Sequence, residues 1–332
     1  MKKVKIAVLG DGGWGTTLAV LLCRKGYSVC LWSAFASYAR YLNRNRVNKK
    51  FLPGIKIPDA VEITYKLHEA IREKDLIILA VPSQYMRAVL SKVKNSGYPK
   101  EAFYLSATKG IEIRTLKRMS ELIYEKLGRV KLAVLSGPTI AQEVARGLPT
   151  TAVIASSVKA ARKYLQGILM TENFRLYTNS DVVGVELGGS LKNIIAIACG
   201  VSDGLGFGAN TKAALLSRGL FEMAKLGLAM GAGPKTFGGI TGLGDLVTTC
   251  ISPYSRNRTV GEQIGKGKTA REIIKGMEMV AEGIPTAKSA YALSRKYKVE
   301  MPITKEIYNI LYKDKDPKKV VRDLMTRQKR EE

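Results

Sequence analysis

The sequence predicts an N-terminal α/β domain, built on a doubly wound and mostly parallel sheet, followed by an all-α C-terminal domain. Strand and helix patterns alternate through the first half, a glycine-rich turn follows the first strand, and long helical periodicities fill the second half. At 332 residues, of which 46% are hydrophobic, the chain is long enough to bury two cores. We place the boundary near residues 180–184, which gives domains of residues 1–182 and 183–332.

The expected strands are mostly continuous apolar runs, as is typical of parallel strands covered by helices on both faces. They span residues 4–10, 28–32, 76–81, 102–106, 131–136 and 151–155. Helical patterns lie between them at residues 13–26, 85–93, 115–127 and 160–170. After about residue 181 the glycine-rich breaks at 204–208 and 238–244 separate helical stretches, and no convincing strand pattern occurs.

A glycine-rich turn lies between the first expected strand and the first expected helix. From Gly10 through Gly12 to Gly15 it reads Gly-Asp-Gly-Gly-Trp-Gly, the G-x-G-x-x-G spacing. Such glycines allow a tight turn and a close approach of the backbone to a pyrophosphate, whose charge then lies at the helix N-terminus. This context predicts a Rossmann-type dinucleotide site.

The choice of dinucleotide depends on the end of the second strand. After Trp32 no Asp or Glu occurs up to Ser37 to hold the ribose 2′-hydroxyl of NAD, and the nearest arginine is Arg40. Without a repelling carboxylate, NADP is expected to be tolerated.

The formal net charge of +26 is compatible with nucleic acid, an anionic membrane surface or small anionic molecules as partners. The basic residues are spread thinly, however, and their densest clusters, at 44–50 and 313–330, are not interleaved with aromatic residues. We therefore expect a small anionic substrate, no nucleic acid and no stable membrane insertion. No signal-peptide core and no run of 18 apolar residues are found, which predicts a cytoplasmic protein.

Cysteine and histidine usage narrows the possible chemistry. The four cysteines, Cys23, Cys30, Cys199 and Cys250, are scattered, which argues against a zinc site, a redox pair or a disulfide framework. The only histidine, His68, lies in a charged helical segment and is expected on the surface. Acid–base chemistry must then come from lysine or carboxylates, and no metal is expected.

A single lysine, Lys192, interrupts the apolar segment 184–204. At helical spacing it shares a face with Ile195, Ala196 and Cys199, so its ammonium is expected to be poorly hydrated and its pKa lowered. The alternative is a lysine whose stem packs on the core while its head reaches water. Lys212 also heads an apolar face, and the residues alone do not separate the two lysines.

Several segments combine these features in one order along the chain: residues 10–15, 107–112, 136–150, 184–208, 242–246 and 255–257. Over nearly its whole length the chain resembles bacterial NAD(P)-dependent glycerol-3-phosphate dehydrogenases. The resemblance implies reversible reduction of dihydroxyacetone phosphate to sn-glycerol 3-phosphate, the backbone precursor of phospholipids. It also implies NAD or NADP as the cofactor and a tendency to form homodimers.

The resemblance also implies roles for individual residues. Lys192 corresponds to the lysine that transfers the proton, and Lys109 to a second active-site lysine that touches substrate and cofactor. Asp245 would orient Lys192, and Arg256 offers a planar fork to the phosphate dianion. Further substrate contacts are implied at Gly137, Thr139, Asp245, Ser255 and Asn257. Further cofactor contacts are implied at Gly13, Trp14, Ala141, Arg256, Val280 and Glu282.

Two positions depart from the family pattern. Gly13 stands where the family often has serine, and Ala34 stands where many members have Arg or His. With neither a carboxylate nor a cation after Trp32, we expect use of both cofactors, with at most a modest preference for NADP.

Two alternatives stay open for the sequence alone. One is another two-domain Rossmann dehydrogenase with a lysine acid–base group, acting on a different small hydroxy acid or phosphosugar. The other is a catalytically silent dinucleotide sensor or scaffold, against which both lysines and Asp245 argue.

Overall fold

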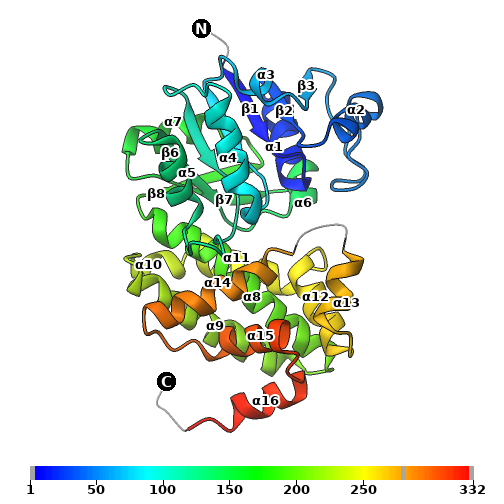
Figure 1. The fold of residues 1–332 in the computed structure, drawn as a ribbon, viewed down its shortest axis with the longest axis vertical. Helices are drawn as coiled ribbons and strands as arrows, with labels where there is room; N and C mark the ends of the chain where they lie inside the picture. Colours follow the sequence, from blue (N-terminus) through cyan, green and yellow to red (C-terminus); the bar gives the residue numbers. More distant parts are fainter. Residues whose placement is uncertain (1–3, 278–280, 329–332) are drawn as a thin grey trace. The chain divides into compact units, whose positions relative to one another are not determined.

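The computed structural model describes residues 4–277 and 281–328 (Figure 1). The chain divides into two compact units. One unit contains the residues up to Lys109 together with Lys117–Glu186. The other contains Gly110–Leu116 together with the residues from Leu187 onward.

A single sheet forms the centre of the first unit. In the described part of the chain it has eight strands, in the order β3-β2-β1-β4-β5-β6-β7-β8. Neighbours are parallel except for β6 and β7, which are antiparallel. The strand order reverses at β1, and in such sheets the ligand site lies at the carboxyl ends of the strands near this point. The strands are β1 Lys5–Leu9, β2 Ser28–Trp32, β3 Val61–Thr64, β4 Leu76–Leu79, β5 Phe103–Ser106, β6 Lys131–Ser136, β7 Thr150–Ala155 and β8 Phe174–Asn179.

The predicted α/β fold is confirmed, and each of the six expected strands is present with small changes at its ends. The strands β3 and β8 were not predicted. They lie at the two edges of the sheet, and along each of them buried residues alternate with more exposed ones. A search for continuous apolar runs passes over such strands.

Helices connect the strands of this unit. They are α1 Gly13–Arg24, α2 Ala36–Asn45, α3 Leu67–Ile71, α4 Met86–Asn95, α5 Met119–Leu127, α6 Ala141–Ala145 and α7 Lys159–Leu169. The helix predicted to begin at residue 115 begins at Met119. The reason is local, because Leu116 has a φ of 61° and the backbone N–H of Arg118 donates to the Glu121 carboxylate, 2.8 Å away.

The two faces of the sheet bury separate cores. Along β1, Ile6 and Val8 belong to the cluster that includes α1, whereas Ala7 and Leu9 belong to the cluster that includes α4. All four side chains are fully buried. This burial on both faces explains why the central strands read as unbroken apolar runs.

In the described residues the second unit is helical and contains no strand, as predicted. Apart from α8 (Val182–Gly204), which begins in the first unit, its helices are α9 Ala209–Ala229, α10 Pro234–Phe237, α11 Asp245–Ile251, α12 Arg256–Gly265, α13 Ala270–Gly276, α14 Gly283–Lys296, α15 Pro302–Lys313 and α16 Pro317–Met325. A π-helical turn, η2 (Ile240–Gly244), precedes α11.

The helix α8 is long and apolar enough to cross a membrane by length and composition, and no other described helix is. However, 89% of its most apolar stretch is buried within the protein. Helix α8 is therefore the core helix of the second unit, which explains its almost unbroken apolar sequence.

Four glycines bring α8 and α12 close together. A Cβ on Gly200 would lie 2.0 Å from the carbonyl oxygen of Arg258, and a Cβ on Gly261 would lie 2.0 Å from that of Ile197. Gly204 and Gly265 face each other in the same way. The backbones of the two helices thus touch, with no room for side chains between them.

Glu222 of α9 ties down the start of α15. Its carboxylate accepts hydrogen bonds from the backbone N–H groups of Ile303 and Thr304, at 2.6 and 3.1 Å. Burial raises the pKa of Glu222 to about 7. The folded pKa therefore lies above the unfolded value of about 4.3.

This shift predicts a pH-dependent stability. The contribution of Glu222 is fully present below its unfolded pKa and is lost as the pH rises through 7. We expect the wild type to lose stability relative to Glu222→Gln between about pH 4 and 7, by at most about 1.4 kcal/mol per pH unit, with little further change above this range. Urea unfolding of both proteins at several pH values measures this difference, and a constant difference would contradict the prediction.

Candidate active site

The glycine turn forms the junction of β1 and α1. Gly10 has a φ of 119°, and a Cβ there would lie 2.6 Å from the carbonyl oxygen of Ala80. A Cβ on Gly15 would lie 1.9 Å from the carbonyl oxygen of Gly10. Helix α1 begins at Gly13 with Gly12 as its N-cap, no side chain caps it, and its first turn has no acidic residue. The turn therefore fits a pyrophosphate, which would accept hydrogen bonds from the open N–H groups of α1.

The departure at Gly13 has a steric cause. A Cβ at this position would lie 2.6 Å from the carbonyl oxygen of Phe51. Ala141 lies next to the turn, because the Thr17 hydroxyl donates to the Ala141 carbonyl, 3.1 Å away. Trp14 packs edge-on against Phe174 with ring centroids 6.4 Å apart. The residues predicted around the turn thus lie together.

The end of β2 carries an acidic group that sequence reasoning missed. The Ser33 hydroxyl donates to the carboxylate of Asp11, 2.5 Å away. Asp11 belongs to the glycine turn and precedes Ser33 by 22 positions, so the sequence around the end of β2 gives no sign of this carboxylate. The next residue, Ala34, is exposed.

Lys109, Gly137 and Thr139 form a second predicted group at the carboxyl edge of the sheet. Lys109 follows β5 and Gly137 follows β6, and these strands are parallel neighbours. The Lys109 ammonium donates to the Gly137 carbonyl at 2.8 Å, and the Thr139 hydroxyl donates to the same oxygen at 3.1 Å. The sheet therefore brings Lys109 next to Gly137 and Thr139, although Lys109 precedes Gly137 by 28 positions in the sequence.

Lys192 lies in the core of the second unit and is paired with Asp245. The two side chains are 6% and 1% exposed, and the ammonium donates to the Asp245 carboxylate. It also donates to the Thr249 hydroxyl, 2.7 Å away, which in turn donates to the main-chain carbonyl of Asp245 at 2.7 Å. A buried carboxylate favours the ammonium form of Lys192 and so works against desolvation. The expected link between Lys192 and Asp245 is present, and Thr249 joins it.

Lys212 has different surroundings. Its side chain is 26% exposed and pairs with Asp203 at 2.7 Å, and Arg258 binds the same carboxylate at 2.7 Å. Lys212 is thus part of a partly exposed ion-pair group, whereas Lys192 is buried and pairs with the buried carboxylate of Asp245. The two lysines, which the sequence patterns do not distinguish, therefore differ in burial and in their ion-pair partners.

Ser255, Arg256 and Asn257 lie at the N-terminus of α12. Ser255 is the N-cap, and its hydroxyl accepts from the backbone N–H of Arg258 at 3.3 Å. Asn257 is buried, donates to Asn193 at 2.9 Å and accepts from the backbone N–H of Gly283 at 2.9 Å. Asn257 therefore holds three helices together, and its amide has one N–H left for a ligand.

Arg256 reaches solvent beside Glu282. Surrounding atoms lower the pKa of Arg256 by desolvation, and the negative charge of Glu282 opposes the shift. The guanidinium stays protonated at neutral pH. Val280, the remaining predicted cofactor contact, lies outside the described residues.

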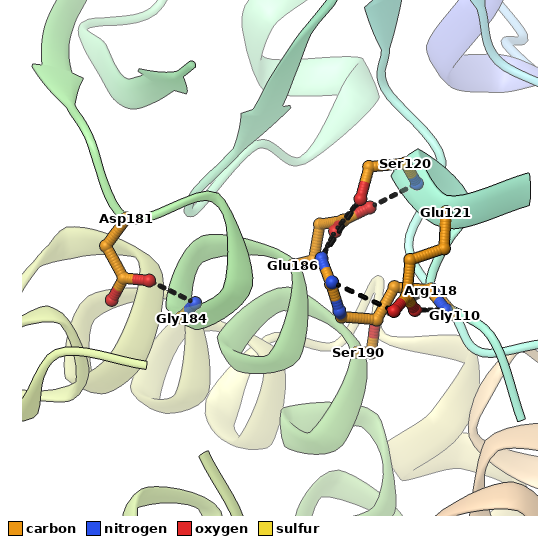
Figure 2. A network of polar contacts seen from close by, with 8 residues as sticks. All are labelled: Gly110, Arg118, Ser120, Glu121, Asp181, Gly184, Glu186 and Ser190. Carbon is orange, nitrogen blue, oxygen red and sulfur yellow. Dashed lines mark hydrogen bonds and ion pairs between the residues drawn. The ribbon is translucent and has the colours of Figure 1, made fainter. Parts of the chain in front are cut away.

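A buried polar network holds the start of α8 (Figure 2). Glu186 accepts hydrogen bonds from the backbone N–H of Ser120 at 2.8 Å and from Arg118 at 2.6 Å. Asp181 caps the helix by accepting from the Gly184 N–H at 2.8 Å. Further along α8, the Ser190 hydroxyl accepts from the backbone N–H of Gly110 at 2.9 Å. These contacts fix the helix that carries Lys192, and no motif in the sequence indicated them.

The fold and these groups together define a class: a dinucleotide-dependent dehydrogenase with a buried ion pair of a lysine and an aspartate in its helical unit. Two family models match the chain, the N-terminus of NAD-dependent glycerol-3-phosphate dehydrogenase over residues 5–162 and the C-terminus over residues 181–322. The chain belongs to the NAD-dependent glycerol-3-phosphate dehydrogenase family.

Individual relatives agree with this assignment. The chain is 51% identical over 326 residues to a glycerol-3-phosphate dehydrogenase [NAD(P)+] from Citrifermentans bemidjiense, covering 97% of each chain. It is 50% identical over 329 residues to one from Thermoanaerobacter sp., covering 99% of each chain. The crystal structure of glycerol-3-phosphate dehydrogenase from Coxiella burnetii superposes with a TM-score of 0.95 at 38% identity, covering 98% of this chain and 99% of that one.

Proposed function

We propose that Lys192, Lys109 and Arg256 perform the reaction of this family in the present chain. That reaction is the reversible reduction of dihydroxyacetone phosphate to sn-glycerol 3-phosphate with NADH or NADPH. The product is the backbone precursor of glycerophospholipids. The main support for Lys192 as the catalytic group is its buried ion pair with Asp245.

Lys192 serves as the proton donor to the carbonyl oxygen during reduction and as the acceptor in the reverse direction. Asp245 and Thr249 accept hydrogen bonds from its ammonium and so hold it in one position. Positive charge next to a carbonyl stabilises the negative charge that develops on its oxygen. Lys109 is proposed as a second such cation.

The glycine turn and the N-terminus of α1 hold the dinucleotide, with Ala141 beside them. Bound nicotinamide supplies the hydride. No residue of the chain has to carry electrons, which agrees with a site built from lysines, carboxylates and hydroxyls.

Arg256 and the N-terminus of α12 are proposed to bind the substrate phosphate. A guanidinium binds a phosphate through two parallel hydrogen bonds, and the partial positive charge of a helix N-terminus adds to this attraction. Ser255 sets the start of the helix, and Asn257 has one N–H donor to offer.

This assignment predicts a dependence on the substrate phosphate. Dihydroxyacetone should react far more poorly than dihydroxyacetone phosphate. Arg256→Ala should weaken the binding of the phosphorylated substrate by about 1.5–3 kcal/mol for each charged hydrogen bond lost. This loss of binding free energy corresponds to an increase in KM of at least about tenfold. Steady-state oxidation of NADH measures both effects.

Arg271→Ala is the matched control, because this arginine of α13 has an 83% exposed side chain and lies outside the proposed site. It should leave KM unchanged. Comparable rates on the two substrates, or equal effects of the two arginine variants, would show that the phosphate binds elsewhere.

We further propose a cytoplasmic homodimer, on the strength of the family resemblance. Light scattering of the purified protein measures the mass of the particle, and a monomeric mass would contradict the dimer.

A further inference from the structure

The end of β2 is the place where this fold holds the adenosine ribose of a dinucleotide. The residues after Trp32 offer no acidic group there. The structure supplies one from another element, because the Ser33 hydroxyl, directly after β2, donates to the carboxylate of Asp11. The inference drawn from this contact rests on the proposed dinucleotide site.

Asp11 is held firmly in this position. The backbone N–H of its neighbour Gly10 donates to the carbonyl of Trp32 at 3.1 Å, which joins the turn to the end of β2. The main-chain carbonyl of Asp11 accepts from the Asn48 amide at 2.8 Å and from the Thr16 hydroxyl at 3.2 Å. Asn48 is fully buried and also donates to Thr16 at 2.8 Å. Hydrogen bonds therefore hold both the side chain and the main chain of Asp11 in place.

No cation of the described residues neutralises the charge of Asp11. Among the residues that the structure describes, Asp11 forms no ion pair. Burial raises the pKa of Asp11, and its bond to Ser33 opposes the shift. The negative charge of Asp11 also affects Tyr38. Burial raises the pKa of Tyr38, the charge of Asp11 adds to this effect, and the pKa reaches about 12.

We propose that Asp11 determines the cofactor preference of this enzyme in favour of NAD. Its carboxylate takes the place of the acidic residue that is absent after Trp32. It accepts a hydrogen bond from the adenosine ribose of NAD and repels the 2′-phosphate of NADP. The preference therefore has the opposite sign to the modest NADP preference that the residues after Trp32 suggested.

The test compares wild type with Asp11→Asn, which keeps the size of the side chain and its ability to bond Ser33 but removes the charge. Fluorescence titration without substrate gives Kd for NADH and for NADPH, and turnover of dihydroxyacetone phosphate gives kcat/KM for each. Wild type should favour NADH by at least about tenfold, and Asp11→Asn should reduce this ratio by about tenfold or more through Kd for NADPH.

Two further variants exclude indirect effects. Asp59→Asn removes the same charge from a side chain that is 77% exposed in the same unit, and it should leave the ratio unchanged. Ser33→Ala removes the hydroxyl but keeps the carboxylate, and it should keep the preference for NADH. Asp11→Ala also removes the charge, should lower the preference for NADH in the same way, and provides the test if Asp11→Asn does not fold.

The outcomes are distinct. If neither cofactor binds to wild type, the dinucleotide site itself is wrong. If NADH binds as proposed but NADPH binds equally well, or if Asp11→Asn and Asp59→Asn change the ratio equally, the role of Asp11 is overturned and the site stands.

Discussion

Lys192→Ala is expected to lower kcat by roughly 10²–10⁴-fold while NADH binding survives. Lys192 is the buried cation of the second unit that pairs with Asp245, and the glycine turn lies in the other unit, so the variant leaves the turn intact. Removing the ammonium takes away the proposed proton donor and the cation that pairs with the buried Asp245 carboxylate. Steady-state kinetics and fluorescence titration with NADH measure the two effects separately.

Lys212→Ala is the matched control for this variant. Lys212 also heads an apolar helix face, but it is partly exposed, and Arg258 remains bound to Asp203 when Lys212 is removed. Its loss should change kcat far less than the loss of Lys192. The reverse order of effects would mean that the wrong lysine has been assigned.

Gly261→Ala is expected to have the largest effect on stability. The new Cβ would lie 2.0 Å from the carbonyl oxygen of Ile197 and 2.8 Å from the backbone nitrogen of Val201. Both contacts are with backbone, so α8 and α12 must separate, at a cost of at least about 2 kcal/mol. Because α8 carries Lys192 and α12 begins with Arg256, activity should fall as well. Urea unfolding gives the change in free energy.

Gly276→Ala serves as the control, because this glycine lies in α13 and a Cβ there meets nothing within 4 Å. In a helix alanine is favoured over glycine, so this variant should be neutral or slightly stabilising. A similar small effect of Gly261→Ala would show that the helices separate easily.

The sequence predicts those features that depend on neighbouring residues. The strand, turn and helix around Gly10–Gly15 are of this kind, because their signal lies within a short stretch of chain. The buried strands next to β1 are predicted for the same reason. The edge strands β3 and β8 lack this signal, since each is covered less completely and its pattern is short or mixed.

The site depends on contacts between distant residues, and local patterns do not contain them. Lys192 and Lys212 look alike in the sequence, and their difference arises from Asp245, which lies 53 positions from Lys192. Asp11 meets Ser33 across 22 positions, so a search restricted to residues after Trp32 does not find it. The expected position of the phosphate group at Arg256 came from the family resemblance, because Ser-Arg-Asn alone is an ordinary polar loop.

The placement of tryptophan has a spectroscopic consequence. Both tryptophans of the chain, Trp14 and Trp32, lie in the sheet unit. The Trp32 indole N–H donates to the Tyr65 carbonyl at 2.9 Å, and Trp14 is part of the glycine turn. Indole emission therefore reports on the sheet unit and its nucleotide site, whereas far-UV circular dichroism is weighted toward the helical unit. Denaturation curves that coincide by both signals would mean that the two units unfold as one cooperative block, and separated curves would give each unit its own stability.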